Sequence, residues 1–337
     1  MSKKSRVKQR DEHGARTPPD DVSPRQPCPC GSGRRYKHCH GRVGGPPAPF
    51  VSRPFDRLPG ECDWVALREI VPAATATLTL QDAPEQQQVI HPVTHPVTHP
   101  VTHPVTREVT VCSLLPMAIP AVVRADASIW LGLQVHANHG DVSRDLAHTL
   151  ELALAAEPGS QIMLPGPPPP GPRLQDLVAP GSAFAVTVHD GFDFWLGDAD
   201  DPDGQLAAAL KTANERAAPT RRLESVEAAY WTRVGGREFV RWVRPEDESV
   251  LVNALARLHA AGDDRLGEAG RLIGMFRAHG VLTPVWELPA GTGPDRLDDA
   301  LATLATRVAE AVADGSALTA EQRAARNGLA NRQLTIR

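Results

Sequence analysis

Three cysteines and a histidine stand close together near the amino terminus, within CPCGSGRRYKHCHGR at residues 28–42. The candidate ligands, spaced C-x-C-x8-C-H, are Cys28, Cys30, Cys39 and His40. Three thiolates and a neutral imidazole suit tetrahedral zinc, and four protein ligands are typical of a structural site. His38 is an alternative imidazole ligand that the sequence does not exclude. The stretch therefore predicts one bound zinc ion.

The spacing allows these side chains to reach a single ion. Alternate residues of an extended chain face the same side, so Cys28 and Cys30 can bind together. Gly31 and Gly33 allow a tight reversal, and backbone amides there can hydrogen-bond the thiolates. So short a segment cannot bury a useful core, and the metal would have to supply its folding energy, on the order of 10 kcal/mol or more.

A disulfide is the weaker interpretation of the same cysteines. A bond between Cys28 and Cys30 would be strained and would need an oxidising compartment. The amino-terminal sequence lacks the apolar stretch of a secretory signal, and no apolar run is long enough to predict a membrane span. We therefore expect a cytoplasmic protein with reduced thiols. Cys62 and Cys112 are isolated, and we expect them to be buried or incidental.

Charge is unevenly distributed along the chain. Residues 1–42 hold eleven Lys or Arg against four Asp or Glu, a net charge of +7, whereas the remaining residues hold 25 against 36, a net charge of −11. A basic segment on an acidic body indicates an anionic partner, and a solvated tail that aids solubility is the alternative. The expected contact residues are Arg34, Arg35, Tyr36 and Lys37. A protein or ribosomal partner is the leading hypothesis, and nucleic acid is an alternative.

The same stretch resembles the SEC-C motif, the zinc-binding tail of the translocation ATPase SecA, over residues 27–42. The resemblance implies that both cysteines of C-x-C, the third cysteine and the adjacent histidine bind zinc. It also implies docking, because the SecA tail is associated with an export chaperone, ribosomes and phospholipid. The motif is amino-terminal here and carboxy-terminal in SecA. No G-x-x-x-x-G-K-[ST] phosphate loop occurs, which argues against an ATPase motor.

Composition divides the chain around this motif. Residues 1–27 are charged and polar, which predicts a disordered basic tail. Glycine and proline at residues 43–60 indicate a linker. Residues 61–337 are expected to form an α+β domain of antiparallel sheet plus helices, and two similar halves would meet within 199–223.

Period-two alternation predicts strands at residues 75–80, 109–115 and 129–135. Asp190–Gly191 and Gly235–Gly236 each predict a hairpin, the first between residues 184–188 and 192–196. Pro284 predicts that VLTPVWEL is an edge strand. Five tryptophans are expected on strands, in the core or at an interface: Trp130, Trp195, Trp231, Trp242 and Trp286.

Leucine spacing of three and four predicts the helices. They are expected at residues 143–156 with Leu154 on the apolar side, at 205–213, at 247–261, at 295–313, and before His279–Gly280 with Leu266, Ile273 and Phe276. A last helix begins at Thr319, with Gln322 completing a capping box.

A perfect four-fold repeat, HPVTHPVTHPVTHPVT, occupies residues 91–106. In an extended chain its histidines would share one face, so a metal strip is one interpretation. Proline at every fourth position excludes a central strand, and a loop insert of this kind costs little closure entropy. We therefore expect a surface loop, with any role of the repeat left open.

No residue is predicted to be catalytic. The chain contains no G-x-S-x-G, no H-E-x-x-H and no G-x-G-x-x-G opening a helix after a strand. Segments such as VHDGFDFW, EAAYW, LARLHAAG, FRAHGVLTPVWELP and NRQLTIR resemble an uncharacterised actinobacterial family that opens with SEC-C. That resemblance implies no known activity. The leading hypothesis is a zinc-dependent adaptor, and the alternatives are an enzyme with an accessory zinc module or a nucleic-acid-binding protein.

Overall fold

The computed structural model describes residues 23–27, 35–38, 50–81, 108–196 and 204–332. The chain divides into two compact units, residues 1–48 and 49–337. The second unit combines helices with two mostly antiparallel sheets, which confirms the predicted α+β class. No helix in these ranges is long and apolar enough to cross a membrane. The HPVT repeat at 91–106 lies outside the described residues.

The first sheet has six strands in the order β5-β3-β4-β2-β1-β6. In chain order the strands are β1 (Ala74–Thr79), β2 (Glu108–Cys112), β3 (Ala121–Val123), β4 (Ile129–Gly132), β5 (Gln161–Ile162) and β6 (Val186–Val188). β2 and β4 pair in parallel, and the other neighbours pair antiparallel. Along β1, Ala74, Ala76 and Leu78 are buried, while the alternating threonines face the other side of the sheet.

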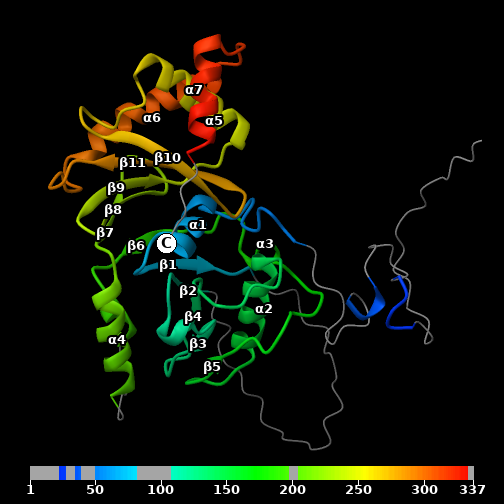
Figure 1. The fold of residues 1–337 in the computed structure, drawn as a ribbon. Helices are drawn as coiled ribbons and strands as arrows, with labels where there is room; N and C mark the ends of the chain where they lie inside the picture. The colour runs from blue at the N-terminus through cyan, green and yellow to red at the C-terminus, as the bar shows by residue number, and fades with distance from the viewer. Residues whose placement is uncertain (1–22, 28–34, 39–49, 82–107, 197–203, 333–337) are drawn as a thin grey trace, which may run out of the picture. The chain divides into compact units, whose positions relative to one another are not determined.

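Helix α1 (Glu61–Glu69) lies between the two sheets (Figure 1). Every residue from Cys62 to Leu67 is buried, so these positions have no solvent-exposed face and no amphipathic period that would predict the helix. It begins after Gly60, whose φ of 66° is left-handed, and a Cβ at that position would lie 3.0 Å from the Cβ of Phe184. Glycine is therefore required where the chain enters α1.

Shorter elements and two longer helices complete the first half. They are the 3-10 helices η2 (Pro116–Ala118) and η3 (Asp193–Trp195), with α2 (Val142–Leu154), α3 (Leu174–Leu177) and α4 (Gln205–Arg216). Asp141 caps α2 by accepting from the backbone amides of Ser143 and Arg144. Leu146 and Leu150 are buried as expected, but Leu154 is 42% exposed, because α2 extends past the core at its last turn.

The second sheet has five antiparallel strands in the order β10-β11-β9-β8-β7. The strands are β7 (Thr220–Leu223), β8 (Ala229–Val234), β9 (Arg237–Trp242), β10 (Arg271–Ala278) and β11 (Val281–Leu288). Helices α5 (Glu248–Ala261), α6 (Leu297–Ala313) and α7 (Ala320–Ala330) cover the face turned away from the first sheet (Figure 1).

Two large hydrophobic clusters follow from this layering. The first joins α1, the first sheet and one face of the second sheet, and it includes Tyr230 and Val285. The second lies between the other face of that sheet and α5–α7, and it includes Trp231 and Trp286. Consecutive residues thus enter opposite clusters, because side chains alternate along a strand. Phe55, in the segment expected as a linker, is fully buried in the first cluster.

Several predicted elements are confirmed. β8 and β9 form the hairpin around Gly235–Gly236, whose φ angles of 57° and 79° suit a tight two-residue turn. The helices predicted at 205–213, 247–261 and 295–313 correspond to α4, α5 and α6. Thr319 and Gln322 form the predicted capping box of α7.

The hairpin predicted around Asp190–Gly191 is wrong. β6 pairs with β1 instead, and residues 193–195 form η3. This segment packs its aromatic rings, among them Phe192 and Trp195, in a small cluster beside Ala73. Trp195 is therefore buried as expected, but it does not lie on a strand.

The helix predicted before His279–Gly280 is also wrong, since residues 271–278 form β10. A register shift between Leu272 and Gly274 marks a bulge. Because of it, Leu272 and Met275 enter one cluster while Ile273 and Phe276 pack on the other. The bulge thus produces a spacing of three that resembles a helical period.

VLTPVWEL is a strand, as predicted, but it is not at an edge. β11 lies between β10 and β9. Pairing with β9 begins at Val285, opposite Arg241, so Pro284 stands just before that ladder and faces Met275 of β10. The missing amide of Pro284 is tolerated because the ladder with β9 does not include that residue.

Candidate functional site

In the first unit, the structure describes residues 23–27 and 35–38, which flank the predicted ligands in the sequence. Pro27 and Arg35 form an antiparallel bridge, and Tyr36 donates its backbone amide to Gln26 across 2.7 Å. A 3-10 helix, η1 (Tyr36–His38), follows, and Lys37 donates its amide to Pro24. The chain on either side of residues 28–34 is therefore held together, as a C-x-C arm and a returning segment require.

All four predicted ligands, Cys28, Cys30, Cys39 and His40, lie outside the described residues, as does Arg34. Of the remaining predicted contact residues, Arg35 and Lys37 are exposed and Tyr36 is half-buried. His38, the alternative ligand, is exposed at the end of η1. Arg35 and Lys37 thus place two cations at the surface within three positions.

The described residues of the body hold no group of three His, Cys, Asp or Glu side chains placed to bind a metal ion. Cys62 and Cys112 are buried, as expected, and neither forms a disulfide. Burial raises the pKa of both thiols, so they are protonated and unreactive at neutral pH.

One cleft of the body gathers polar groups. It has a volume of about 400 Å³ and is lined by Arg68, Glu69, Leu114, Ala118, Gln134, Val135 and His136. Arg68 and Glu69 end α1, Leu114 follows β2, and Gln134 to His136 follow β4. The cleft therefore lies beyond the carboxyl ends of the parallel pair β2 and β4, the kind of position where α/β sheets bind ligands.

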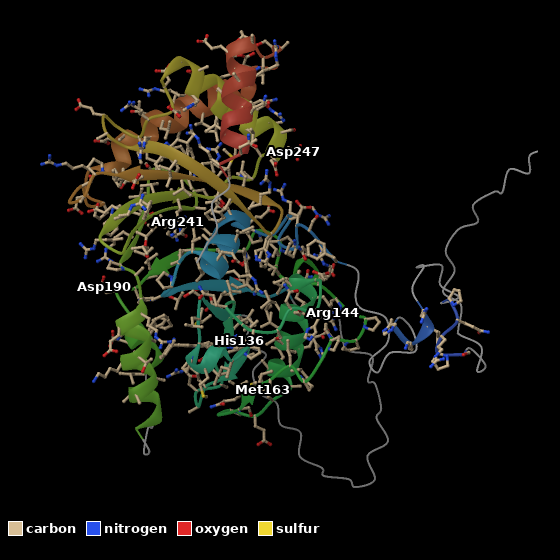
Figure 2. All side chains as sticks on the ribbon, in the orientation of Figure 1. His136, Arg144, Met163, Asp190, Arg241 and Asp247 are labelled. Carbon is tan, nitrogen blue, oxygen red and sulfur yellow. The ribbon has the colours of Figure 1, made fainter. Side chains whose placement is uncertain are left out.

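The charged groups of the cleft are constrained by neighbours. The side chain of Arg68 is 8% exposed, donates to the carbonyl of Leu133, and has its Nε 3.8 Å from Glu69 Oε1. Burial lowers the pKa of Arg68. Glu69 Oε1 also lies 2.7 Å from His279 Nε2, at the turn between β10 and β11. His136 is exposed beside the first sheet (Figure 2).

The wall of the cleft contains unusual backbone. Met117 and Ala118 both have left-handed φ angles, 55° and 54°, although neither is glycine. Such residues cost on the order of 1–3 kcal/mol each and persist where the surroundings hold them. The amide of Ala118 donates to Leu115, and Ser113 bonds both Pro72 and Ala74, which fixes the chain that leaves β2.

Two polar pairs lie outside the cleft. Asp63, 2% exposed, accepts from Tyr230 Oη at 2.6 Å and from Arg222 Nη2 at 3.0 Å, which links α1 to the second sheet. Thr75 Oγ1 lies 2.9 Å from His189 Nε2. Burial lowers the pKa of His189, but no carboxylate in the described ranges orients its ring, so the pair lacks the third member of a nucleophile–base set.

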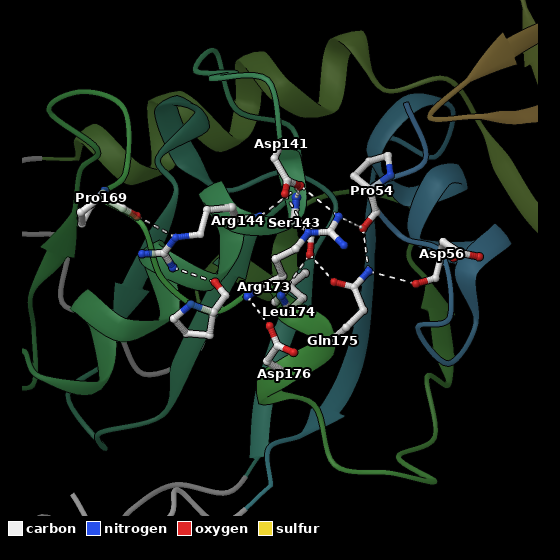
Figure 3. Close-up of polar contacts among 11 residues, drawn as sticks. Pro54, Asp56, Asp141, Ser143, Arg144, Pro169, Arg173, Leu174, Gln175 and Asp176 are labelled. Atoms are coloured by element: carbon white, nitrogen blue, oxygen red, sulfur yellow. Dashed lines mark hydrogen bonds and ion pairs between the residues drawn. The ribbon is translucent and has the colours of Figure 1, made fainter. Parts of the chain in front are cut away.

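Figure 3 shows a polar network that fixes the proline-rich loop after β5. Buried Arg144 donates to the carbonyls of Pro169 and Pro172 at 3.0 and 2.8 Å. Arg173 binds the Asp141 carboxylate at 2.7 and 3.1 Å. These hydrogen bonds fasten the loop to the start of α2.

Sequence reasoning did not find the cleft. Its residues come from three segments and form no motif. The signal that could have found them is topological, because two parallel strands end at one edge of a sheet, and pairing of β2 with β4 cannot be seen in the sequence.

Comparison with known proteins divides the chain into the same two parts as its compact units, residues 1–48 and 49–337. A family of unknown function (DUF5926) matches residues 54–337, and the SEC-C motif matches residues 25–42. Protein translocase subunit SecA of Rubrobacter xylanophilus is 64% identical over 28 residues, 8% of this chain and 3% of that protein. SecA of Acidithiobacillus ferrooxidans is 71% identical over 24 residues, 7% of this chain and 3% of that protein.

The chain thus spans only 3% of the length of these curated relatives, all of it at the SEC-C segment. No solved structure matches the chain. The similarity to SecA concerns the motif alone, and the body differs from SecA.

Proposed function

Because the chain belongs to the family of unknown function DUF5926 and carries a SEC-C motif, we propose that it is a zinc-dependent docking protein. The SEC-C segment attaches the α+β body to a protein or ribosomal partner. The observation that carries the proposal is the motif match over residues 25–42, which includes all four candidate ligands.

The residues present fit a zinc ion. Cys28, Cys30, Cys39 and His40 supply three sulfur donors and one nitrogen donor, the set that zinc prefers in closed structural sites. The paired backbone at Pro27 and Arg35 is consistent with a chain that leaves and returns beside this set. Zinc, when bound, supplies folding energy and no reaction chemistry, because four protein ligands leave no open position.

The docking surface consists of exposed cations within the motif. Arg35 and Lys37 are exposed on either side of Tyr36, which is half-buried, and Arg34 adds a third positive charge in the sequence. Residues 1–42 carry a net charge of +7, which attracts an anionic surface over about 10 Å at moderate ionic strength. Thiolate ligands also require a reducing compartment, so we place the docking event in the cytoplasm.

The test begins with the metal content of the full chain. Wild-type protein should contain one zinc per chain by elemental analysis, and Cys30→Ser should contain far less. Crosslinking to cell extract, with and without chelator, should then capture a zinc-dependent partner. Absence of stoichiometric zinc in protein made in zinc-replete medium would overturn the proposal.

A charge-reversal pair separates docking from metal binding. Arg35→Glu with Lys37→Glu should keep the zinc and lose the partner. The matched control is Lys211→Glu with Arg216→Glu, two exposed cations on α4 of the body. If both pairs lose the partner equally, contact is through general charge. If the captured partner is nucleic acid with affinity that falls steeply with salt, the basic segment binds nucleic acid instead.

A further inference from the structure

The cleft beyond β2 and β4 is not used by the docking function, and it contains donors and acceptors that have no hydrogen-bond partner among the described residues. Its volume, about 400 Å³, lies within the usual range of small-molecule sites, about 300–1,000 Å³. Both charged and apolar residues line it. The unused hydrogen-bonding groups therefore indicate which ligand it can hold.

Arg68 supplies the donors. Among the described residues its only hydrogen bond runs from Nη1 to the carbonyl of Leu133, which leaves Nε and Nη2 without a hydrogen-bond partner. Neither atom is among the fully buried unpartnered atoms of the described chain, although the side chain is 8% exposed. Both atoms therefore keep some solvent exposure, and Arg68 lines the cleft, where a planar guanidinium presents a fork that matches a carboxylate.

Gln134 and Glu69 supply the acceptors. Gln134 donates from Nε2 to the carbonyls of Leu67 and Val71 at 2.8 and 2.9 Å, which uses both amide hydrogens and leaves Oε1 free to accept. Glu69 bonds His279 through Oε1 alone, so Oε2 is free. The orientation of Gln134 is fixed by its two carbonyl partners, because only an NH2 group can donate to both.

We propose that this cleft binds an α-amino acid with an apolar side chain. The carboxylate is held by Arg68, and the ammonium group is held by Glu69 Oε2 and Gln134 Oε1. Leu114, Ala118 and Val135 provide the apolar wall for the side chain. The constrained backbone at Met117 and Ala118 holds this wall in place before the ligand arrives.

Two other ligand classes fit less well. A simple anion such as phosphate would meet Arg68, but it would also face the Glu69 carboxylate, whose Oε1 lies 3.8 Å from Arg68 Nε. Phosphate has no ammonium group to donate to Gln134 Oε1 and Glu69 Oε2, so these two acceptors would be left unpaired. A metal ion would need three ligating side chains gathered together, and no such group exists among the described residues.

The probe is leucine, tested on the full chain by isothermal titration calorimetry, with two analogues that each lack one charged group. 4-Methylpentanoate keeps the carboxylate and isoamylamine keeps the ammonium. We expect leucine to bind, and each analogue to bind about 10- to 100-fold more weakly. Loss of one hydrogen bond to a charged group lowers the affinity by about this factor. Inorganic phosphate should not compete with leucine.

Variants assign the two ends of the ligand. Arg68→Gln should weaken leucine binding about 10- to 100-fold. Arg241→Gln is the control, because Arg241 is likewise half-buried and lies on the second sheet away from His136 (Figure 2). Unlike Arg68, its side chain has no hydrogen bond or ion pair in the described chain. Glu69→Gln should weaken leucine binding and leave the weaker binding of 4-methylpentanoate unchanged or improved.

Several outcomes would overturn the proposal. These are no binding of leucine by wild-type protein, equal binding of leucine and 4-methylpentanoate, or displacement of leucine by phosphate. If Arg68→Gln fails to fold, Glu69→Gln still decides, because the Glu69 side chain is one-third exposed and the change preserves side-chain shape. Cys30→Ser should bind leucine as the wild type does, so failure here is distinguishable from failure of the docking proposal.

Discussion

Residues 28–42 and the α+β body hold their polar chemistry in different ways. In the first region, four candidate ligands stand within thirteen positions of the sequence. In the body, the polar groups of the cleft come from the end of α1 and the residues after β4, and the segment after β2 adds apolar wall. The first region is too short to bury a core, whereas the body has two large hydrophobic clusters.

Because of this difference, the two regions depend on different interactions to become ordered. A motif of adjacent ligands needs only an ion to become ordered. A cleft assembled from three segments needs the whole fold, because the packing of α1 between two sheets determines where Arg68 and Glu69 lie. The two regions should therefore respond independently to chelation and to core mutation.

The largest expected effect is on the SEC-C segment. Cys30→Ser should reduce the zinc content from one per chain to near zero and abolish partner capture, because a tetrahedral site with a missing thiolate loses most of its binding free energy. The melting temperature of the body should stay unchanged. Elemental analysis and calorimetry of the same sample check both statements. A body that melts together with metal loss would contradict the independence of the regions.

The next largest effect is expected for a core mutation in the body. Trp64 of α1 is fully buried, with its ring 5.7 Å from that of Phe55 and 4.4 Å from that of Phe184, and its Nε1 donates to Pro59. Trp64→Ala should lower the free energy of unfolding of the body by about 3–5 kcal/mol. Urea denaturation measures it. Zinc stoichiometry at low temperature should be preserved, and loss of zinc at the same urea concentration as unfolding of the body would show that the regions are coupled.

A smaller effect uses the two tyrosines of the chain, one in each region. Tyr230 donates to the buried carboxylate of Asp63, so Tyr230→Phe should cost about 1–3 kcal/mol at pH 7. Tyr36→Phe is the matched control and should leave the unfolding of the body unchanged, since Tyr36 lies in the first unit.

The cost of Tyr230→Phe should also depend on pH. Burial raises the pKa of Asp63, and the Tyr230 hydrogen bond opposes that rise, so its removal raises the pKa further. A carboxyl with a raised folded-state pKa loses stability as pH rises through that pKa. The deficit of the variant relative to wild type should therefore be larger at pH 7 than at pH 4, by urea denaturation. An equal deficit at both values would mean that Asp63 titrates alike in both proteins.

Local signals in the sequence predicted much of this fold. The turn at Gly235–Gly236 and the cap at Thr319 depend on a few adjacent residues, and both are confirmed. The α1 helix was missed because burial on all sides removes its amphipathic period. The apolar residues of β10 resemble a helical pattern because the bulge between Leu272 and Gly274 changes their spacing from two to three.

The candidate sites follow the same division. The candidate zinc ligands could be named from the sequence because they stand within thirteen positions, and they lie outside the described residues. The cleft could not be named, because Arg68 and Gln134 are 66 positions apart and meet only after β2 and β4 pair in parallel. No pattern of residue types within either segment indicates that pairing.

The smallest effect tests whether a local signal in the body acts locally. The hydroxyl of Thr319 accepts from the backbone amide of Gln322, which satisfies one free amide at the start of α7. Thr319→Ala should cost about 1 kcal/mol in the free energy of unfolding. Thr303→Ala, at an exposed site inside α6, is the control and should be neutral or slightly stabilising, since alanine favours helix interiors.

Because α7 packs on α5 and buries Leu329 in the second cluster, fraying of its first turn should weaken this cluster alone. Hydrogen exchange should therefore accelerate in α7 and leave the α1 amides protected. Acceleration in both helices would show that the cap supports the whole body. A feature that is local in the sequence would then depend on the whole fold, as the cleft does.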